Sequence, residues 1–155
     1  MRLKMAQFTE RQKNIIDVSI KLISEKGIQQ LTIKNISKKL GISEPAIYRH
    51  FESKLDILLA ILSQFKGNAQ EVAQRNLLID GSAIDHIEKR FAAHLKQFVL
   101  HPALAAVIFS EEIFQNDKRL SKEVAAIMKL NQAAVSTLVE KGQQKNEIRI
   151  DIPGV

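Results

Sequence analysis

Apolar residues recur every three or four positions along most of the chain, a spacing that places them on one face of a helix. The first such run begins after Thr9, and Gln12 three positions later completes the pattern of a capping box. The run continues to about Lys26, and Gly27 follows it as a helix-ending residue. Only residues 147–153 alternate like a strand, and they are too few to form a sheet alone. The sequence therefore predicts an all-α protein.

A second helix is predicted over residues 33–40. Thr32 precedes it and has the hydroxyl group that favours the capping position. Ile36 and Leu40 are four residues apart, so they lie on the same face. Gly41 then ends the helix.

The stretch 43–54 predicts a third helix of only two turns. Ser43 is suited to cap it, and Pro45 is tolerated in the first turn, where the N–H groups have no helical partner. Ser53 is a second capping residue ten positions later, so the helix cannot be long. The helix carries three adjacent polar side chains, Tyr48, Arg49 and His50. Such a face is unsuited to a core and fits an anionic partner.

The spacing between the second and third helices is that of a helix-turn-helix motif. The small residue Ser37 allows the two helices to approach closely, and Gly41 makes the turn. Aliphatic residues on both sides of the turn hold the helices together: Ile36, Leu40, Ile42 and Ile47.

The positive charge is concentrated in the part of the chain that contains this motif. The whole chain has a net charge of +6. Residues 1–66 contain twelve Lys and Arg against six Asp and Glu, whereas residues 67–155 contain eleven of each. This asymmetry is typical of a nucleic-acid-binding segment joined to a second unit. The alternative is that the lysines only make helix faces soluble.

Four more helices are predicted after the motif. They cover residues 54–78, 83–100, 103–114 and a last stretch from Asn116 or Asp117 to about 141. Ser82 is the cap of the second, the His101–Pro102 pair separates the second from the third, and Gly142 closes the last. The predicted domains are a helix-turn-helix domain over 1–54 and a helical domain over 55–155, with 54–78 as the bridging helix.

The first 60 or so residues carry a set of matching positions: Gly27, Leu31–Ile33, Ile36–Ser37, Gly41–Ser43, Ala46–Phe51, Ser53–Lys54 and Leu58–Leu59. In these positions the chain resembles the TetR (tetracycline-repressor-like) family of transcriptional regulators. The spacing Tyr48-x-His50-Phe51-x-x-Lys54 is quite specific for that family. The rest of the chain resembles the family only in the order of its helices.

The resemblance implies a homodimer whose paired reading helices enter successive major grooves of a palindromic operator in double-stranded DNA. A small molecule bound in the second domain would swing the bridging helix and separate the two readers. The expected function is therefore a ligand-responsive regulator, with repression as the expected outcome. Residues 148–151 resemble the start of two further helices that usually build the family's dimer interface, yet the chain stops at Val155. Either it is a truncated or cleaved form, or its dimer uses other surfaces.

The resemblance also implies roles for single residues. Thr32 would direct the start of the second helix toward a phosphate. Ser43, Tyr48 and His50 would bind phosphate or sugar, and Lys54 would bind a phosphate from the start of the bridging helix.

Four residues remain for the bases. Pro45 and Ala46 lie where bases would be approached closely, and Ala46 can touch a thymine methyl. Arg49 is either a phosphate clamp or a guanine reader. Glu44 departs from the basic or small residues often found there. It is either solvated and favours the helix N-terminus, or it accepts a hydrogen bond from cytosine N4.

Six side chains are candidates to line an apolar effector cavity in the second domain: Phe91, Leu95, Phe98, Phe109, Ile113 and Met128. The alternative is that they form an ordinary core. An apolar lining favours a hydrophobic effector, such as a fatty-acyl, aromatic or cationic drug-like molecule. The Glu111–Glu112 pair either neutralises a cationic ligand or lies on a solvated face.

The sequence gives little support for a metal site or for enzymatic activity. His86, His94 and His101 are eight and seven residues apart, whereas helical metal sites use pairs three or four apart. The chain has no Cys, no phosphate-binding glycine loop and no nucleophile elbow. We therefore expect no metal, no cofactor and no enzymatic activity.

The chain contains no run of 18 apolar residues, and its first residues lack the apolar stretch of a signal peptide. These observations predict a cytoplasmic protein that does not enter a membrane. The alternative function is a basic helical protein that binds nucleic acid or anionic membranes without sequence specificity and without an effector.

Overall fold

The computed structural model describes residues 8–76, 81–110 and 118–151, with side chains throughout except over 68–76. Its helices are α1 (Glu10–Lys26), the short 3-10 helix η1 (Ile28–Gln30), α2 (Ile33–Leu40), α3 (Glu44–Tyr48), α4 (Lys54–Asn76), α5 (Ala83–Leu100), α6 (Pro102–Ile108) and α8 (Lys118–Gln144). These parts of the chain contain no strand, and the all-α prediction is confirmed.

Capping residues begin most of these helices as predicted. The Thr9 hydroxyl accepts a hydrogen bond from the Gln12 N–H at 3.2 Å, and the Gln12 side-chain oxygen accepts one from the Thr9 N–H at 3.0 Å. Thr32 caps α2 and Ser82 caps α5 in the same way, because each hydroxyl accepts a hydrogen bond from the N–H three residues later. Ser43 is different, because it occupies the capping position of α3 but its side chain makes no capping hydrogen bond. The Ser43 hydroxyl is therefore not used to begin its helix.

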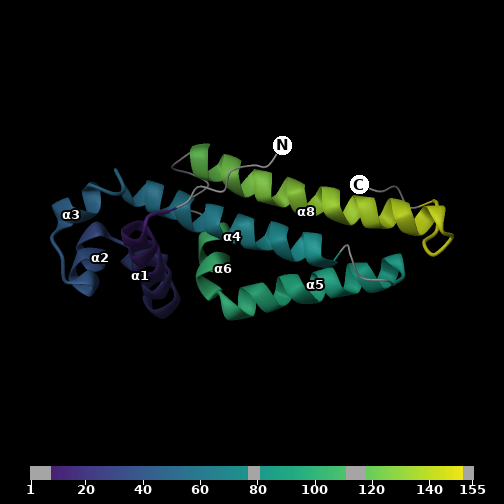
Figure 1. Cartoon of the computed structure of the whole chain (residues 1–155), viewed down its shortest axis with the longest axis horizontal. Coiled ribbons are helices and arrows are strands. Elements are labelled where there is room, and N and C mark those ends of the chain that lie inside the picture. Colours follow the sequence, from purple (N-terminus) through teal and green to yellow (C-terminus); the bar gives the residue numbers. More distant parts are fainter. Residues whose placement is uncertain (1–7, 77–80, 111–117, 152–155) are drawn as a thin grey trace.

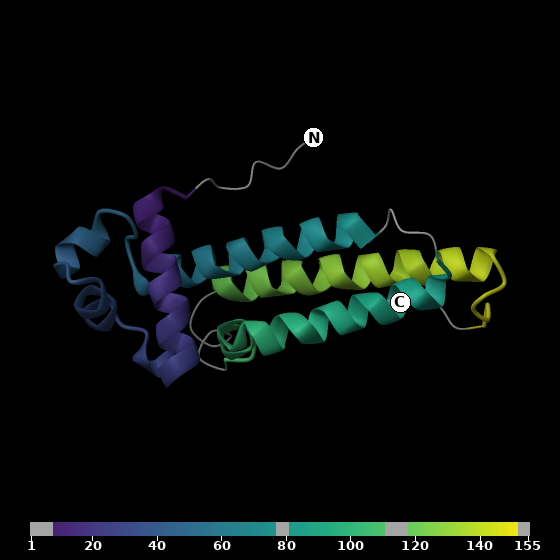
Figure 2. The same ribbon diagram turned by 60° about the horizontal axis from the view of Figure 1, so that its bottom comes forward.

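The helices form two groups. Helices α4, α5 and α8 run side by side as long rods, and α1, α2 and α3 lie together at one end of them (Figure 1). Helix α1 crosses this end at a steep angle to the rods (Figure 2). The short helix α6 follows α5 after a bend of 97° and packs against α1, α4 and α5.

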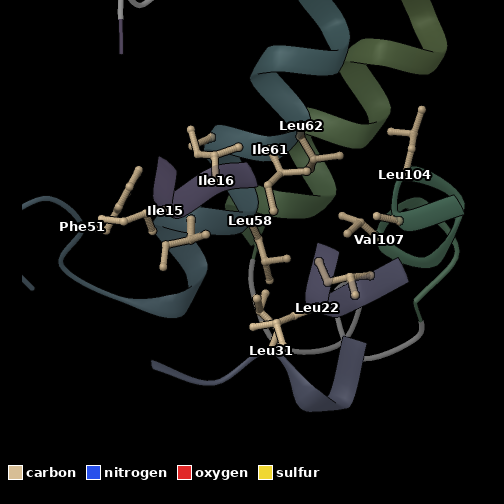
Figure 3. Packing of buried hydrophobic residues seen from close by; sticks show 14 of the residues in the cluster. Ile15, Ile16, Leu22, Leu31, Phe51, Leu58, Ile61, Leu62, Leu104 and Val107 are labelled. Carbon is tan, nitrogen blue, oxygen red and sulfur yellow. The ribbon is translucent and has the colours of Figure 1, made fainter. Parts of the chain in front are cut away.

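One apolar core runs through both groups. It contains Ile15 and Ile16 of α1, Ile36 of α2 and Ile47 of α3, and it continues through α4 into α6 and α8. Leu58, Ile61 and Leu62 of α4 lie in the same cluster as Leu22 of α1 and Val107 of α6 (Figure 3). Burial of each such side chain contributes about 1.5–3 kcal/mol to stability. Helices α1, α2 and α3 are thus joined to the long helices by one continuous apolar core.

Two predicted helix ends differ from the structure. Helix α6 ends at Ile108, several residues before the predicted 114, and Phe109 follows it in a non-helical conformation. Residues 77–80 and 111–117, which include the predicted end of the bridging helix, lie outside the described residues. Gly142 does not close α8, which continues to Gln144.

Gly142 is instead a packing position. It is buried, and a Cβ built on it would lie 2.8 Å from the Ala83 Cβ and 2.7 Å from the Ile148 Cδ1. The Gly142 carbonyl also accepts hydrogen bonds from the N–H groups of Glu147 and Ile148. The glycine allows the start of α5 and the residues after α8 to meet on the last turn of α8.

We expect Gly142→Ala to destabilise the protein by about 1–2 kcal/mol, because the overpacking outweighs the better helix propensity of alanine. Urea unfolding followed by circular dichroism measures the change. In a double-mutant cycle with Ile148→Ala, shortening Ile148 should recover part of the loss. A neutral or stabilising effect of Gly142→Ala alone would contradict this account.

No single helix in the described ranges meets the length and hydropathy criteria for a membrane span, although α5 and α6 meet them together as a bent pair.

Candidate nucleic-acid interface and apolar cavity

Helix α3 is held by two apolar side chains. Ile47 is fully buried and is the only buried residue of this five-residue helix, and Phe51 is buried directly after it. A helix this short has no stability of its own in water, so its position depends on these contacts. The Gln12 side chain of α1 adds a hydrogen bond of 3.3 Å to the His50 carbonyl. The predicted core roles of Ile47 and Phe51 are confirmed.

The turn before α3 has the geometry expected of a helix-turn-helix. Gly41 adopts a left-handed conformation with φ 66° and ψ 32°. This conformation brings the Ile42 N–H to 3.1 Å from the Ser37 carbonyl, so the end of α2 is satisfied within the turn. Ser37 is buried where the helices approach, and its hydroxyl donates to the Lys34 carbonyl at 2.9 Å.

The candidate DNA-contacting residues surround α3 at the end of the molecule (Figure 1). Six of them have exposed side chains: Thr32, Ser43, Glu44, Pro45, Tyr48 and Arg49. Ala46, His50 and Lys54 are partly exposed. They come from the start of α2, from α3 and its flanks, and from the first residue of α4. The buried face of α3 and its polar face are therefore separated as the sequence predicts.

An apolar cavity of about 200 Å³ lies between α4, α5, α6 and α8. Of the six side chains predicted to line an effector cavity, Phe98, Phe109 and Met128 line it. Phe91 and Leu95 do not line it; they are 56% and 65% exposed on the outer side of α5. Ile113 and the Glu111–Glu112 pair lie outside the described residues.

The exposure of Phe91 and Leu95, which were expected to line the cavity, has a geometric cause. The face of α5 that lines the cavity is largely polar and consists of Arg90, Ala93, His94, Gln97 and Phe98. The more apolar stripe of the helix is exposed and consists of Ile84, Phe91, Leu95 and Val99. An apolar stripe at helical spacing is expected to face inward, so the sequence pattern alone selects the wrong face of α5.

The cavity also contains polar side chains that the sequence analysis did not single out. Arg90 Nη2 donates to Asn131 Oδ1 at 2.9 Å, and Asn131 Nδ2 is 3.0 Å from His94 Nε2. Burial lowers the pKa of Arg90 from its usual value, and burial and the charge of Arg90 lower the pKa of His94. Arg90 itself is the signal that the sequence offers for these polar side chains. An arginine on a partly buried face of a helix requires a hydrogen-bond acceptor nearby.

Lys66 also lines the cavity, from α4. Its ammonium group forms a salt bridge of 2.8 Å with Glu123 of α8. Next to it, the rings of Phe65 and His101 meet edge to face at 5.3 Å. His101 and His94 thus have structural contacts, and no group of three His, Cys, Asp or Glu side chains in the described part of the chain is placed to hold a metal ion.

Residues 15–61 match the family model described as "Bacterial regulatory proteins, tetR family". This range includes the turn glycine, all of α3 and the start of α4. Over this range the chain is similar to the TetR family of regulators. The first 14 residues and the cavity lie outside the matched range, so the match concerns the DNA-reading part of the chain.

Two curated relatives extend the similarity beyond this range. The fatty acid metabolism regulator protein of Bacillus subtilis is 23% identical over 94% of this chain and 74% of its own length. The transcriptional repressor BepR of Brucella suis is 26% identical over 77% of this chain and 50% of its own length. Both names describe regulators, and neither describes an enzyme.

Solved structures share the fold. FadR of Bacillus halodurans, a fatty acid degradation regulator, superposes with a TM-score of 0.80 at 20% identity, over 96% of this chain and 76% of that one. FadR of Bacillus subtilis, solved in complex with stearoyl-CoA, has a TM-score of 0.76 at 22% identity, over 92% and 76%. The arrangement of α1–α3 beside three long helices is thus shared with these two regulators.

Proposed function

We propose that this chain is a TetR-family, ligand-responsive repressor that binds a palindromic operator as a homodimer and is released by a small hydrophobic effector. The observation that carries the proposal is the construction of α3. Its apolar side chain is buried in the core that α1, α2 and α4 share, while its polar side chains are exposed together. The alternative, a basic protein without sequence specificity, does not account for a turn glycine and a helix anchored in this way.

We assign DNA reading to residues 1–54 and effector binding to residues 55–155. Tyr48, His50 and Lys54 would fix the position of α3 on the phosphates, and Ser43 and Thr32 would add contacts from the flanking helix ends. Pro45, Ala46 and Arg49 would approach the bases, and Glu44 remains a candidate acceptor or a solvated first-turn residue.

Helix α6 is the element through which an effector could act on α3. Leu104, Ile108 and Phe109 line the cavity from α6 and its end. The same helix packs against α1, and α1 packs against α2 and supports α3 through Gln12. A ligand that displaces α6 would therefore shift the support of α3 as well as the bridging helix α4. Such coupling needs only a difference in ligand affinity between two arrangements of α6.

The size and character of the cavity support a hydrophobic effector, since most of its lining is apolar. That the similar FadR structure of Bacillus subtilis contains stearoyl-CoA agrees with this class of ligand. A regulator of transcription acts where the chromosome is, so we place the protein in the bacterial cytoplasm.

The test is an unbiased selection of operator sequences from random duplexes. We expect a palindromic site, and we expect its affinity to fall steeply with added salt, because Lys and Arg contacts release counterions from the phosphates. Light scattering of the free protein and of its DNA complex would give the number of chains on each site. Equal binding to random DNA and to anionic vesicles would refute the proposal.

The roles of Lys54 and Arg49 differ in a measurable way. Lys54→Ala should weaken binding to all duplexes about equally and lower the slope of log affinity against log salt by about 1. Arg49→Ala serves as the comparison, because a guanine reader would change the preferred sequence at one position. Binding isotherms on the selected operator and its single-base variants at several salt concentrations measure both effects. If Arg49→Ala weakens every sequence alike, Arg49 is a phosphate clamp.

A further inference from the structure

We propose that the effector is an amphipathic anion whose acidic head group binds Arg90 and whose apolar body lies toward α6. This inference rests on the proposed function, because it names the chemical class of the ligand for the same cavity.

The first observation is the balance of charge in the cavity. Its described lining contains two permanent cations, Arg90 and Lys66, and no carboxylate. Lys66 is neutralised by its salt bridge with Glu123 at 2.8 Å. Arg90 donates only to the neutral oxygen of Asn131 within the part of the chain that the structure describes. The cavity therefore has one positive charge that no described acidic group offsets.

The second observation is the protonation state of the neighbouring histidine. Asn131 uses its Oδ1 to accept from Arg90, so its Nδ2 is left to donate to His94 Nε2. A nitrogen that accepts a hydrogen bond carries no proton, which makes His94 neutral in this arrangement. Burial lowers the pKa of His94 and so favours the same state. The positive charge at this end of the cavity thus belongs to Arg90 alone.

The third observation is the order of side chains along the cavity. Arg90, which has no described acidic partner, lies at one end, and the other end holds aromatic and aliphatic side chains with the neutralised Lys66–Glu123 pair beside them. Ala83 lies beside Gly142 and Arg90 beside Asn131, so α5 and α8 run antiparallel. Eight residues separate Arg90 from Phe98 along α5, which corresponds to about 12 Å. The rings of Phe98 and Phe109 are 6.1 Å apart at the far end, where Leu104 and Ile108 add aliphatic surface. A ligand with one anionic end and an apolar body matches this order.

The energetic argument favours an anion over a cation. Partial burial without a charged partner disfavours the guanidinium, and an acidic group would restore the lost interaction through charge-assisted, bidentate hydrogen bonds. A cationic head would instead add repulsion from Arg90. A neutral head would leave the guanidinium as it is.

The experiment compares three amphiphiles with the same chain: decanoate, decanol and decylammonium. Binding to the wild-type protein is measured by isothermal titration calorimetry, and release of the selected operator by fluorescence anisotropy. We expect decanoate to bind at least about tenfold more tightly than decanol and to release the operator, since a hydrogen bond to a charged group typically contributes that much. Decylammonium should bind more weakly than either.

Variants assign the effect to Arg90. Arg90→Gln keeps a hydrogen-bond donor for Asn131 but removes the charge, so the preference for decanoate over decanol should disappear. Lys89→Gln is the matched control, because it removes a positive charge from the adjacent exposed position of α5 and should leave the preference unchanged. Thermal unfolding of each variant without ligand gives its folded fraction.

The outcomes separate the inference from the function on which it rests. If decylammonium or decanol binds as tightly as decanoate and releases the operator, the anion inference is wrong and the ligand-responsive function stands. Retention of the preference for decanoate in a folded Arg90→Gln protein, or binding of none of the three, would also overturn it. If the wild-type protein selects no operator at all, it is the proposed function that fails.

Discussion

An Ile47→Ala variant is expected to lose about 2–5 kcal/mol of unfolding free energy and, with it, most of its affinity for the operator. Ile47 is fully buried and is the only buried residue within α3. Its removal leaves a cavity between α3 and the helices that support it. The side chain faces the core, so any loss of DNA binding would come from the position of α3 and not from a lost contact with DNA.

Two measurements separate these effects. Urea unfolding gives the change in stability, and operator binding is measured at a temperature where the variant is folded. Ile84→Ala is the matched control, because it makes the same substitution at a residue of α5 that is 47% exposed. The control should change stability by no more than about 0.5 kcal/mol and leave DNA binding intact. A folded Ile47→Ala protein with wild-type operator affinity would show that α3 does not depend on this anchor.

The fold of the DNA-reading end could be predicted from the sequence because its signals are local. Thr9, Thr32 and Gly41 act on backbone groups within a few residues of themselves, and each does so as predicted. Ser43 shows the limit of this reasoning. It has the right residue type in the right position, but its side chain makes no capping hydrogen bond, and a hydroxyl on this face is also free to meet another partner.

The cavity could be predicted only in part because its lining depends on how distant helices meet. Phe98 faces the cavity while Phe91, seven residues earlier, is exposed, and periodicity alone favours the exposed stripe of α5 over the face that lines the cavity. The contact between Arg90 and Asn131 joins residues 41 positions apart, so no short-range sequence pattern predicts it. Local rules predict Gly142 as a helix end, whereas in the structure it admits Ala83 and Ile148 against the last turn of α8.

The second large effect is expected at Gly41. Its backbone has φ 66° and ψ 32°, a left-handed conformation that glycine adopts without cost and a β-branched residue does not. A Cβ at this position would meet no atom within 4 Å, so any loss of stability comes from the backbone alone. We expect Gly41→Val to cost about 3 kcal/mol, Gly41→Ala about 1–2 kcal/mol and Gly41→Asn less, since asparagine tolerates this region best.

The order of the series is the decisive result. Thermal or urea unfolding should rank the proteins Gly, Asn, Ala and Val, with operator affinity following the same order because the turn sets the angle between α2 and α3. Gly81 is the control: it is exposed and lies outside the left-handed region, so Gly81→Val should change stability by only about 0.5 kcal/mol. Equal stability of the Asn and Val variants at position 41 would mean that the turn can rearrange, and α3 would then be positioned by its anchors Ile47 and Phe51 and by Gln12, without the turn.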